Sequence, residues 1–399
     1  SMASRAGSQV PFSSLNFGID TSPEGRMVSE YLLKAQMAGL GKHETPIFPI
    51  LIYTLKKGVN FEKGDPNYDI FRLAMECSSK RLFPTYAFVD ASFNLPYYER
   101  DPYYGIINTM GCRTRVMANV NGREGAFGRG NISFTSINLP LLALRAKGNI
   151  DKFFKELDYA LEIADKELLE RYEGQCQNRK YNFPSLMEQG IWLGSDDLAP
   201  TDEIRDVIKQ GTLSIGFVGL AECLIALTGK HHGESQESDE LGYSIIKYIR
   251  DYCDKRVKET HLNFSCLGTP AETYCKTALE QARKQFGIIP GVTDRAYFTN
   301  SSHIPVWYNI SIADKAKIEG KYHNLENAGH IFYCEVDGDI SKNIDAFENI
   351  LHIMSDADVG YGAVNIPIAE CTVCGCSWRG SNDVHVCPGC GRDEREPID

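Results

Sequence analysis

The sequence lacks the two features that bring a protein to DNA or to a membrane, a surplus of positive charge and a long apolar run. Its 42 lysines and arginines stand against 53 aspartates and glutamates, which gives a net charge of −11. We therefore expect neither a nucleic acid nor an anionic membrane as a partner. The longest apolar run, Leu213–Leu227, is interrupted by Ser214 and Glu222 and is too short to span a bilayer.

Nucleotide-binding loop patterns are also missing. The glycines at 122, 125, 128 and 130 form a flexible run, but no Gly-x-Gly-x-x-Gly or Walker pattern is present. Close backbone packing is therefore the better explanation of this run. An anionic substrate would have to be bound locally, by backbone N–H groups and helix N-termini, because the overall charge repels it.

Cysteine is scarce and unevenly placed. Eight of the 13 cysteines are scattered singly between residues 77 and 334, and five lie between 371 and 390. Scattered single cysteines without a secretory signal are typical of a reducing cytosol, so we expect a cytoplasmic protein. The five crowded cysteines need another explanation.

Helical and strand patterns alternate irregularly along the 399 residues, which favours an α/β fold. Ser22 and Pro23 predict a helix start, Asp151 opens an amphipathic helix, and Ser214–Thr228 reads as a buried helix. Composition changes near Pro367, so we expect a main body over 1–366 and a small module over 367–399. Short apolar runs predict buried strands at Ile47–Tyr53, Thr85–Asp90, Ile132–Asn138, Ala296–Asn300 and Ile331–Val336.

The most specific motif is Cys371-x2-Cys374-x12-Cys387-x2-Cys390. Two such pairs let four thiolates converge on one ion, which predicts a closed, structural zinc site. Two disulfides, free thiols or an iron–sulfur cluster are the alternatives. Cys376 is a spare thiol beside the site.

Cys112 lies in a loop between Gly111 and Arg113, where an aromatic-rich stretch meets a glycine-rich one. Taken from the residues alone, a loop cysteine without a role is the simpler interpretation.

Two further segments carry polar groups suited to a ligand. Thr269 as a cap, Pro270 in the first turn and Glu272 behind it predict a helix N-terminus, which can bind phosphate or be an ordinary cap. The cluster Thr299–His303 follows an apolar run, where α/β proteins place active-site side chains. His303 alone would more often be structural than catalytic.

Six stretches, taken together and in order, resemble the catalytic subunit of anaerobic (class III) ribonucleotide reductases. These enzymes use a glycyl radical to reduce ribonucleoside triphosphates. The matching stretches are Ser4–Phe12, Met110–Arg113, Arg129–Ser133, Gly268–Glu272, Thr299–His303 and the four-cysteine motif.

The resemblance implies part of a ten-stranded α/β barrel, with a finger loop near 105–120 and a small C-terminal zinc knuckle. Cys112 matches the finger cysteine that becomes a thiyl radical and takes the 3′-hydrogen of the ribose. Asn131 matches a polar residue beside the ribose hydroxyls, and we expect Cys112 on a buried loop near it. The residues matching the phosphate segment are Thr269, Ala271 and Glu272, and those matching an active-site strand end are Ser301, Ser302 and His303.

The resemblance also implies partners: a radical-SAM activating enzyme, formate or a thioredoxin-like reductant, and a second copy in a homodimer of the complete enzyme. The sequence departs from the family in two respects. We expect it to begin inside the barrel, without the regulatory region, and, since its last glycine is Gly391, to lack the radical glycine that follows the knuckle in the family. We therefore expect a catalytic core that is inactive alone. The alternatives are a non-catalytic or split-gene protein that binds nucleotide or a partner subunit, and a glycyl-radical enzyme with another substrate.

Overall fold

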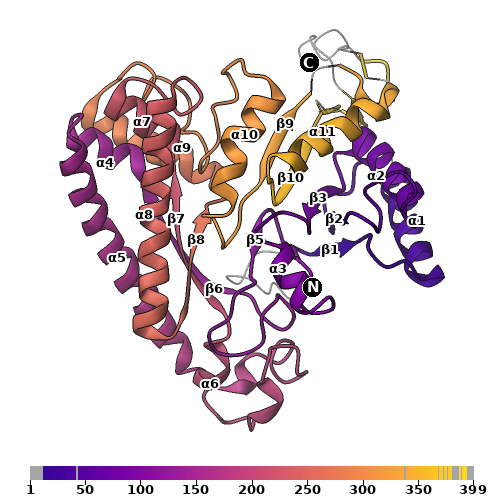
Figure 1. Ribbon diagram of the computed structural model, residues 1–399, viewed down its shortest axis with the longest axis horizontal. Coiled ribbons are helices and arrows are strands. Elements are labelled where there is room, and N and C mark those ends of the chain that lie inside the picture. Colours follow the sequence, from indigo (N-terminus) through magenta and orange to yellow (C-terminus); the bar gives the residue numbers. More distant parts are fainter. Residues whose placement is uncertain are drawn as a thin grey trace.

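A computed structural model describes residues 12–41, 44–336, 338–366, 368–371, 373–374, 376–379, 386–387 and 389–392. Figure 1 shows two groups of elements, with the short strand β5 (Thr114–Arg115) between them. One group holds the long helices α5 (Ile150–Cys176) and α8 (Gln236–Thr260), and the other holds α1 (Pro23–Ala38). The description supports the α/β class expected from the sequence.

The second group is built on a five-stranded sheet. Its order is β1-β2-β3-β10-β9, and all neighbours are parallel except β3 and β10. The strands are β1 (Ser14–Phe17), β2 (Ile50–Leu55), β3 (Thr85–Phe88), β9 (Phe332–Glu335) and β10 (Tyr361–Asn365).

The first group is built on a parallel sheet in the order β6-β7-β8. Gly329, just before β9, forms a parallel bridge with Leu267 of β8, and its carbonyl accepts from the Gly268 amide at 2.9 Å. The two sheets therefore continue into each other at this point and form one curved wall. The three strands are β6 (Asn131–Asn138), β7 (Thr212–Val218) and β8 (Asn263–Gly268).

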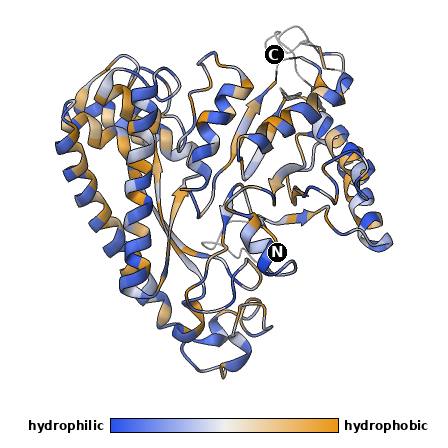
Figure 2. Ribbon diagram, in the orientation of Figure 1, coloured by the Kyte–Doolittle hydropathy of each residue, from blue (hydrophilic) through white to orange (hydrophobic). Residues whose placement is uncertain are grey.

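Helices cover the outer faces of this wall. Phe153 and Leu157 of α5 and Ile246 of α8 pack into one core with Phe217 of β7. Figure 2 shows the same division, with apolar colour on β7 and β8 and alternating colours along α5 and α8. A second core joins α2 (Tyr68–Arg81) and α11 (Ile344–Asp356) to the five-stranded sheet through residues such as Phe71 and Phe347. The other α-helices and strands are α3 (Leu95–Arg100), β4 (Thr109–Met110), α4 (Leu139–Ala146), α6 (Arg205–Ile208), α7 (Leu220–Thr228), α9 (Glu272–Phe286), α10 (Ile312–His323), β11 (Ile368–Glu370) and β12 (Ser377–Arg379).

Two predicted elements are wrong. The segment Ser214–Thr228 is not one helix, because β7 occupies its first part and Gly219, with φ at +76°, separates that strand from α7. A run that is apolar on all sides suits a buried strand as well as a buried helix, so composition could not decide. No strand forms at Ala296–Asn300 within the described chain, and Tyr297 there is 54% exposed.

The other elements agree with the sequence to within a few residues. Ser22 caps α1 by accepting from the Gly25 amide at 3.1 Å. The helix expected from Asp151 is α5, capped by Asn149, whose side chain accepts from the Lys152 amide. In the part of the chain that is described, no helix is both long and apolar enough to cross a membrane.

Candidate functional site

The finger predicted near 105–120 is the hairpin of β4 and β5. Thr109 pairs with Arg115 and Met110 with Thr114, which leaves Gly111, Cys112 and Arg113 at the tip. Gly111 has φ at +58°, a left-handed conformation that suits glycine at a tight turn.

Both sides of the hairpin are fixed to the wall. The Asn16 side chain of β1 donates to the Thr109 carbonyl and accepts from its amide, both at 3.0 Å. On the other side the Arg115 amide donates to the Ala328 carbonyl at 2.7 Å. The hairpin therefore lies between the two sheets, as a finger inside a barrel does.

Cys112 itself is exposed, so the expectation of a buried loop is wrong for this chain taken by itself. A Cβ added to the neighbouring Gly111 would meet nothing within 4 Å. The tip is therefore open at Gly111 and Cys112, whereas the Arg113 side chain beside them is buried. The two strands of the finger are fixed, and the Cys112 thiol at its tip is accessible to a ligand.

Asn131 begins β6 and is bound to the neighbouring strand. Its side-chain nitrogen, Nδ2, donates to Thr212 Oγ1 at 3.0 Å and to Ser214 Oγ at 2.6 Å. Ser214 in turn contacts Ser265 Oγ at 3.1 Å, so a polar row crosses β6, β7 and β8. No hydrogen bond among the described residues joins Asn131 to Cys112.

The segment 299–304 is held by three buried glutamates, which is the most unusual feature of the structure. Glu222 of α7 accepts from the amide and the hydroxyl of Thr299, at 2.9 and 2.7 Å. Glu326 accepts from the Ser302 hydroxyl. Glu319 of α10 accepts hydrogen bonds from His303 Nδ1 at 3.0 Å and from the Ile304 amide at 2.8 Å.

The three carboxyls differ in their electrostatics. Burial raises the pKa of Glu326 to about 8, against the opposing effects of Ser302 and the Arg113 cation. Burial also raises the pKa of Glu222. Burial works in the same direction on Glu319, but the Lys315 cation and His303 outweigh it and lower its pKa. The surroundings of Glu319 therefore favour its ionised form, whereas burial disfavours that form in the other two.

Arg113 connects the finger to this segment. Its Nη1 lies 3.4 Å from the Ser301 hydroxyl and 3.4 Å from the Gly268 carbonyl. The structure thus brings the predicted residues Ser301, Ser302 and His303 together with the finger, through the residue next to Cys112.

A cavity of about 670 Å³ opens beside this segment. Thr299, Asn300 and His303 line one part of it, and Glu335 and Asn365, the last residues of β9 and β10, line another. Carboxyl ends of parallel strands are where α/β proteins bind small molecules. Thr299, Asn300 and His303 lie beside such a cavity, although the described residues just before them form no strand. Their part in a reaction stays a prediction.

The helix start expected at Thr269 lies a little later in the chain. Thr269 is not a cap, because its hydroxyl bonds to Ser136 Oγ at 2.8 Å. Ala271 is the residue before α9, and it has no side-chain oxygen to cap with. Helix α9 begins at Glu272, whose side chain lies outside the described part of the chain. A second cavity, of about 460 Å³, touches Thr269, Ala271 and Arg171. The N-terminal amides of α9 suit an anion, whereas Arg171 is already paired with Glu167, which also lines this cavity.

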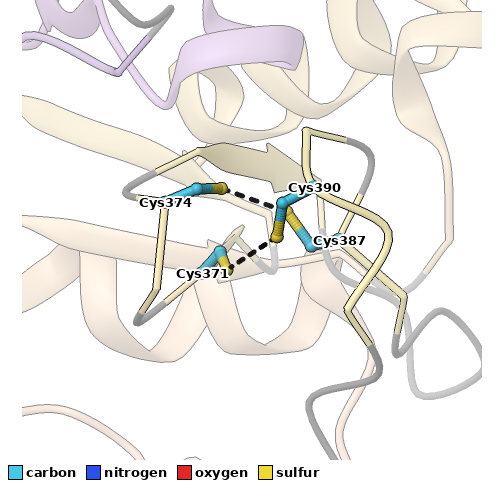
Figure 3. A group of neighbouring side chains, drawn as sticks. All are labelled: Cys371, Cys374, Cys387 and Cys390. Atoms are coloured by element: carbon cyan, nitrogen blue, oxygen red, sulfur yellow. Dashed lines mark hydrogen bonds between the residues drawn. The ribbon is translucent and has the colours of Figure 1, made fainter.

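The four cysteines of the C-terminal motif converge (Figure 3), with all four sulfurs within 4.8 Å of one another. Cys371 and Cys390 are 3.7 Å apart, and Cys374 and Cys387 are 3.5 Å apart. A tetrahedral ion with bonds of about 2.3 Å separates its sulfurs by roughly 3.8 Å, so the geometry fits zinc. The Gly389 amide also donates to Cys387 Sγ at 3.3 Å, as amides in such turns do. The site can hold a metal ion.

Comparisons with known proteins agree with this architecture. The family profile of the anaerobic ribonucleoside-triphosphate reductases matches residues 1–399. The chain belongs to that family. It is 35% identical to the anaerobic ribonucleoside-triphosphate reductase of Escherichia coli K12, over 98% of this chain and 55% of that protein. It is 30% identical to the reductase of the same name from Enterobacteria phage T4, over 97% of this chain and 62% of that protein.

A solved structure with a similar fold is the anaerobic ribonucleotide reductase from Thermotoga maritima with glycerol in the active site. Its TM-score is 0.68 at 17% identity, covering 96% of this chain and 61% of that one. The barrel fold inferred for the main body is thereby confirmed. The chain spans between 54% and 62% of the length of the curated reductases that it matches.

Sequence reasoning missed the residues that organise the site. Glu222 was visible only as an interruption of an apolar run, while Glu319 and Glu326 have no distinctive spacing. A glutamate inside an apolar stretch is a usable signal, because a buried carboxyl needs partners. The partners themselves become visible only in three dimensions.

Proposed function

We propose that this chain is the catalytic core of an anaerobic ribonucleoside-triphosphate reductase, which converts ribonucleoside triphosphates to deoxyribonucleotides. The observation that carries the proposal is the finger, a hairpin fixed between two sheets with Cys112 at its tip, in a chain of this family. A thiol presented at one fixed point inside a barrel suits hydrogen abstraction, which requires close and constant geometry.

The proposed chemistry begins at the Cys112 sulfur. As a thiyl radical it takes the 3′-hydrogen of the ribose, so that an S–H bond forms and a carbon-centred radical remains on the sugar. Asn131 is proposed to bind the ribose hydroxyls. Thr269, Ala271 and Glu272 are proposed to bind the phosphates, and Ser301, Ser302 and His303 to line the site. The net charge of −11 gives no general attraction to an anion, so bound phosphates need local hydrogen-bond donors. The backbone amides at the start of α9 are such donors and support the phosphate assignment.

The proposal includes a division of the chain and its partners. Residues 1–366 would form the barrel portion and 367–399 a zinc module, in which Cys371, Cys374, Cys387 and Cys390 hold a structural zinc ion. The metal would cross-link the module and take no part in the reaction. A glycyl radical, formed by a radical-SAM activating enzyme, would be the radical store. Formate or a thioredoxin-like dithiol would supply electrons in the cytoplasm, and the complete enzyme would be a homodimer.

The test is an anoxic incubation of the chain with an activating enzyme, S-adenosylmethionine, a reductant and a peptide carrying the family's glycyl-radical loop. Product is measured by mass spectrometry of the nucleotides. We expect deoxyribonucleotide from the wild-type chain and none from Cys112→Ser. Nucleotide binding by the wild-type chain without any product would instead favour the non-catalytic alternative.

A further inference from the structure

Arg113 and Cys112 are neighbours in sequence with opposite environments. The Cys112 side chain is exposed, whereas Arg113 is only 1% exposed and is among the largest fully buried side chains. Burying a guanidinium is costly unless its environment compensates the charge. The sequence therefore places a costly buried cation beside the thiol of the finger, which calls for a function.

Part of the compensation for the buried charge of Arg113 comes from the segment 299–304, which lines the cavity of about 670 Å³. Arg113 Nη1 faces the Ser301 hydroxyl and the Gly268 carbonyl. A Cβ added to Gly268 would lie 2.8 Å from Glu326 Oε2, so the Glu326 carboxyl packs against the residue whose carbonyl faces Arg113. Glu326 is itself 1% exposed and accepts from the Ser302 hydroxyl. One cation and one carboxyl thus bracket the serine pair.

The backbone of the finger touches the same region. Thr114 forms an antiparallel bridge with Gly329. A Cβ added to Gly329 would lie 2.3 Å from the Arg113 carbonyl oxygen. The φ of Gly329 is +146°. Only glycine permits this approach, so the finger and the segment 326–329 are fitted closely to each other.

We propose that Arg113 is a positioning residue: its buried guanidinium, acting with Glu326, fixes the finger tip relative to Ser301 and Ser302. The catalytic relevance of this coupling rests on the proposed function. The coupling itself does not, because it concerns contacts within this chain. Arg113 touches no reacting atom in this account. It determines where Cys112 stands.

The test measures hydrogen exchange of the finger amides by mass spectrometry in Arg113→Gln, Arg113→Lys and Glu326→Gln. We expect exchange of the peptide covering 109–116 to rise about tenfold in Arg113→Gln, the effect of losing one charge-assisted contact. It should also rise in Glu326→Gln, because that change replaces the carboxyl that accepts from Ser302 with an amide. The double variant should add little to either single one, because both remove the same coupling. Arg113→Lys should recover part of the protection, since it keeps the charge and loses the planar fork.

Arg123→Gln is the matched control. Arg123 is an exposed arginine outside the hairpin that stacks on Tyr104 at 3.6 Å, so its loss should leave finger exchange unchanged. Unchanged finger exchange in both Arg113→Gln and Glu326→Gln would overturn the proposal. So would an equal rise in every barrel peptide, which would indicate a general structural role. Should Arg113→Gln fail to fold, the near-isosteric Glu326→Gln carries the test.

A second readout applies where reductase activity is measurable. A misplaced thiol should lower kcat about tenfold or more and leave the KM for the nucleotide within about twofold. Absence of all activity in the wild-type chain would contradict the proposed function and leave the exchange result standing. A rise in KM alone would contradict the positioning role.

Discussion

The finger region and the cysteine cluster are two sites organised in opposite ways. The cluster draws all four sulfurs from one stretch of sequence, Cys371 to Cys390, and brings them within 4.8 Å of one another. The finger region joins residues from distant parts of the chain, since Arg113 meets Ser301 across 188 positions of the sequence. The first depends on local spacing and, in the proposed function, on a metal ion. The second depends on the whole wall being folded.

The difference shows where each site gets its stability. A cysteine knuckle has little core of its own, so the metal supplies much of its folding free energy. The finger region has buried carboxyls, a buried guanidinium and hydrogen bonds that only an intact barrel can align. Perturbing the metal should therefore leave the finger in place, and perturbing the core should not.

The largest expected effect separates the two sites completely. Cys374→Ser should lower bound zinc from about one ion per chain to about none, because a structural site needs all four ligands. The unfolding temperature of the barrel should stay unchanged in the same sample. Elemental analysis and calorimetry measure both. Cys376→Ser is the control and should keep the metal, and iron or no metal in the wild-type protein would contradict the assignment.

The next effect addresses the barrel core. Phe217 on β7 is fully buried in the core between β7, α5 and α8. Phe217→Ala should destabilise the barrel by about 3–5 kcal/mol, through lost burial and a residual cavity. Phe134→Ala, on a side chain that is 41% exposed, should cost less than about 1 kcal/mol. Urea unfolding compares the two, and equal losses would contradict the assigned core.

A smaller effect tests the clamp, the set of buried glutamates that holds the segment 299–304: Glu222, Glu319 and Glu326. Glu319→Gln replaces a carboxylate that accepts from both His303 and the Ile304 amide with an amide that presents an N–H₂ group to one of them. We expect a loss of about 1–3 kcal/mol in unfolding free energy. The exposed Glu280→Gln on α9 should change it by less than about 0.5 kcal/mol. A neutral Glu319→Gln would show that the clamp is not needed for stability.

The last effect is a dependence of stability on pH. The folded protein keeps the Glu326 proton up to a pKa of about 8, whereas the unfolded chain releases it near its ordinary value of 4.5. Stability from this group is therefore full below pH 4.5 and is lost as the pH rises toward 8. Burial lowers the pKa of His330 to about 3, so this group changes the stability only below pH 6.5. It therefore does not contribute to the dependence above that pH.

Thermal unfolding between pH 6.5 and 8.5 measures this dependence. The unfolding temperature of the wild-type protein should fall across this range, and that of Glu326→Gln should fall less. Parallel curves for the two proteins would mean that Glu326 does not titrate there.

The two sites also differ in how far the sequence predicts them. The knuckle was predictable because its spacing is itself the geometry, and the resemblance to a family located Cys112 on a finger. The clamp on 299–304 was not predictable, because Glu222, Glu319 and Glu326 come from separate elements and have ordinary neighbours in sequence. Thr269 has the residue type of a helix cap, but its hydroxyl is bound to Ser136 on another strand. Long-range partners decide such cases.

The central claim, that Cys112 is the reacting group of a nucleotide reductase, is tested most directly with a ribonucleoside triphosphate that carries deuterium at the 3′ position. In the anoxic assay with activating enzyme, S-adenosylmethionine, reductant and radical-loop peptide, we expect slower product formation from the deuterated substrate and none from Cys112→Ser. Product formation by Cys112→Ser at the wild-type rate would contradict it.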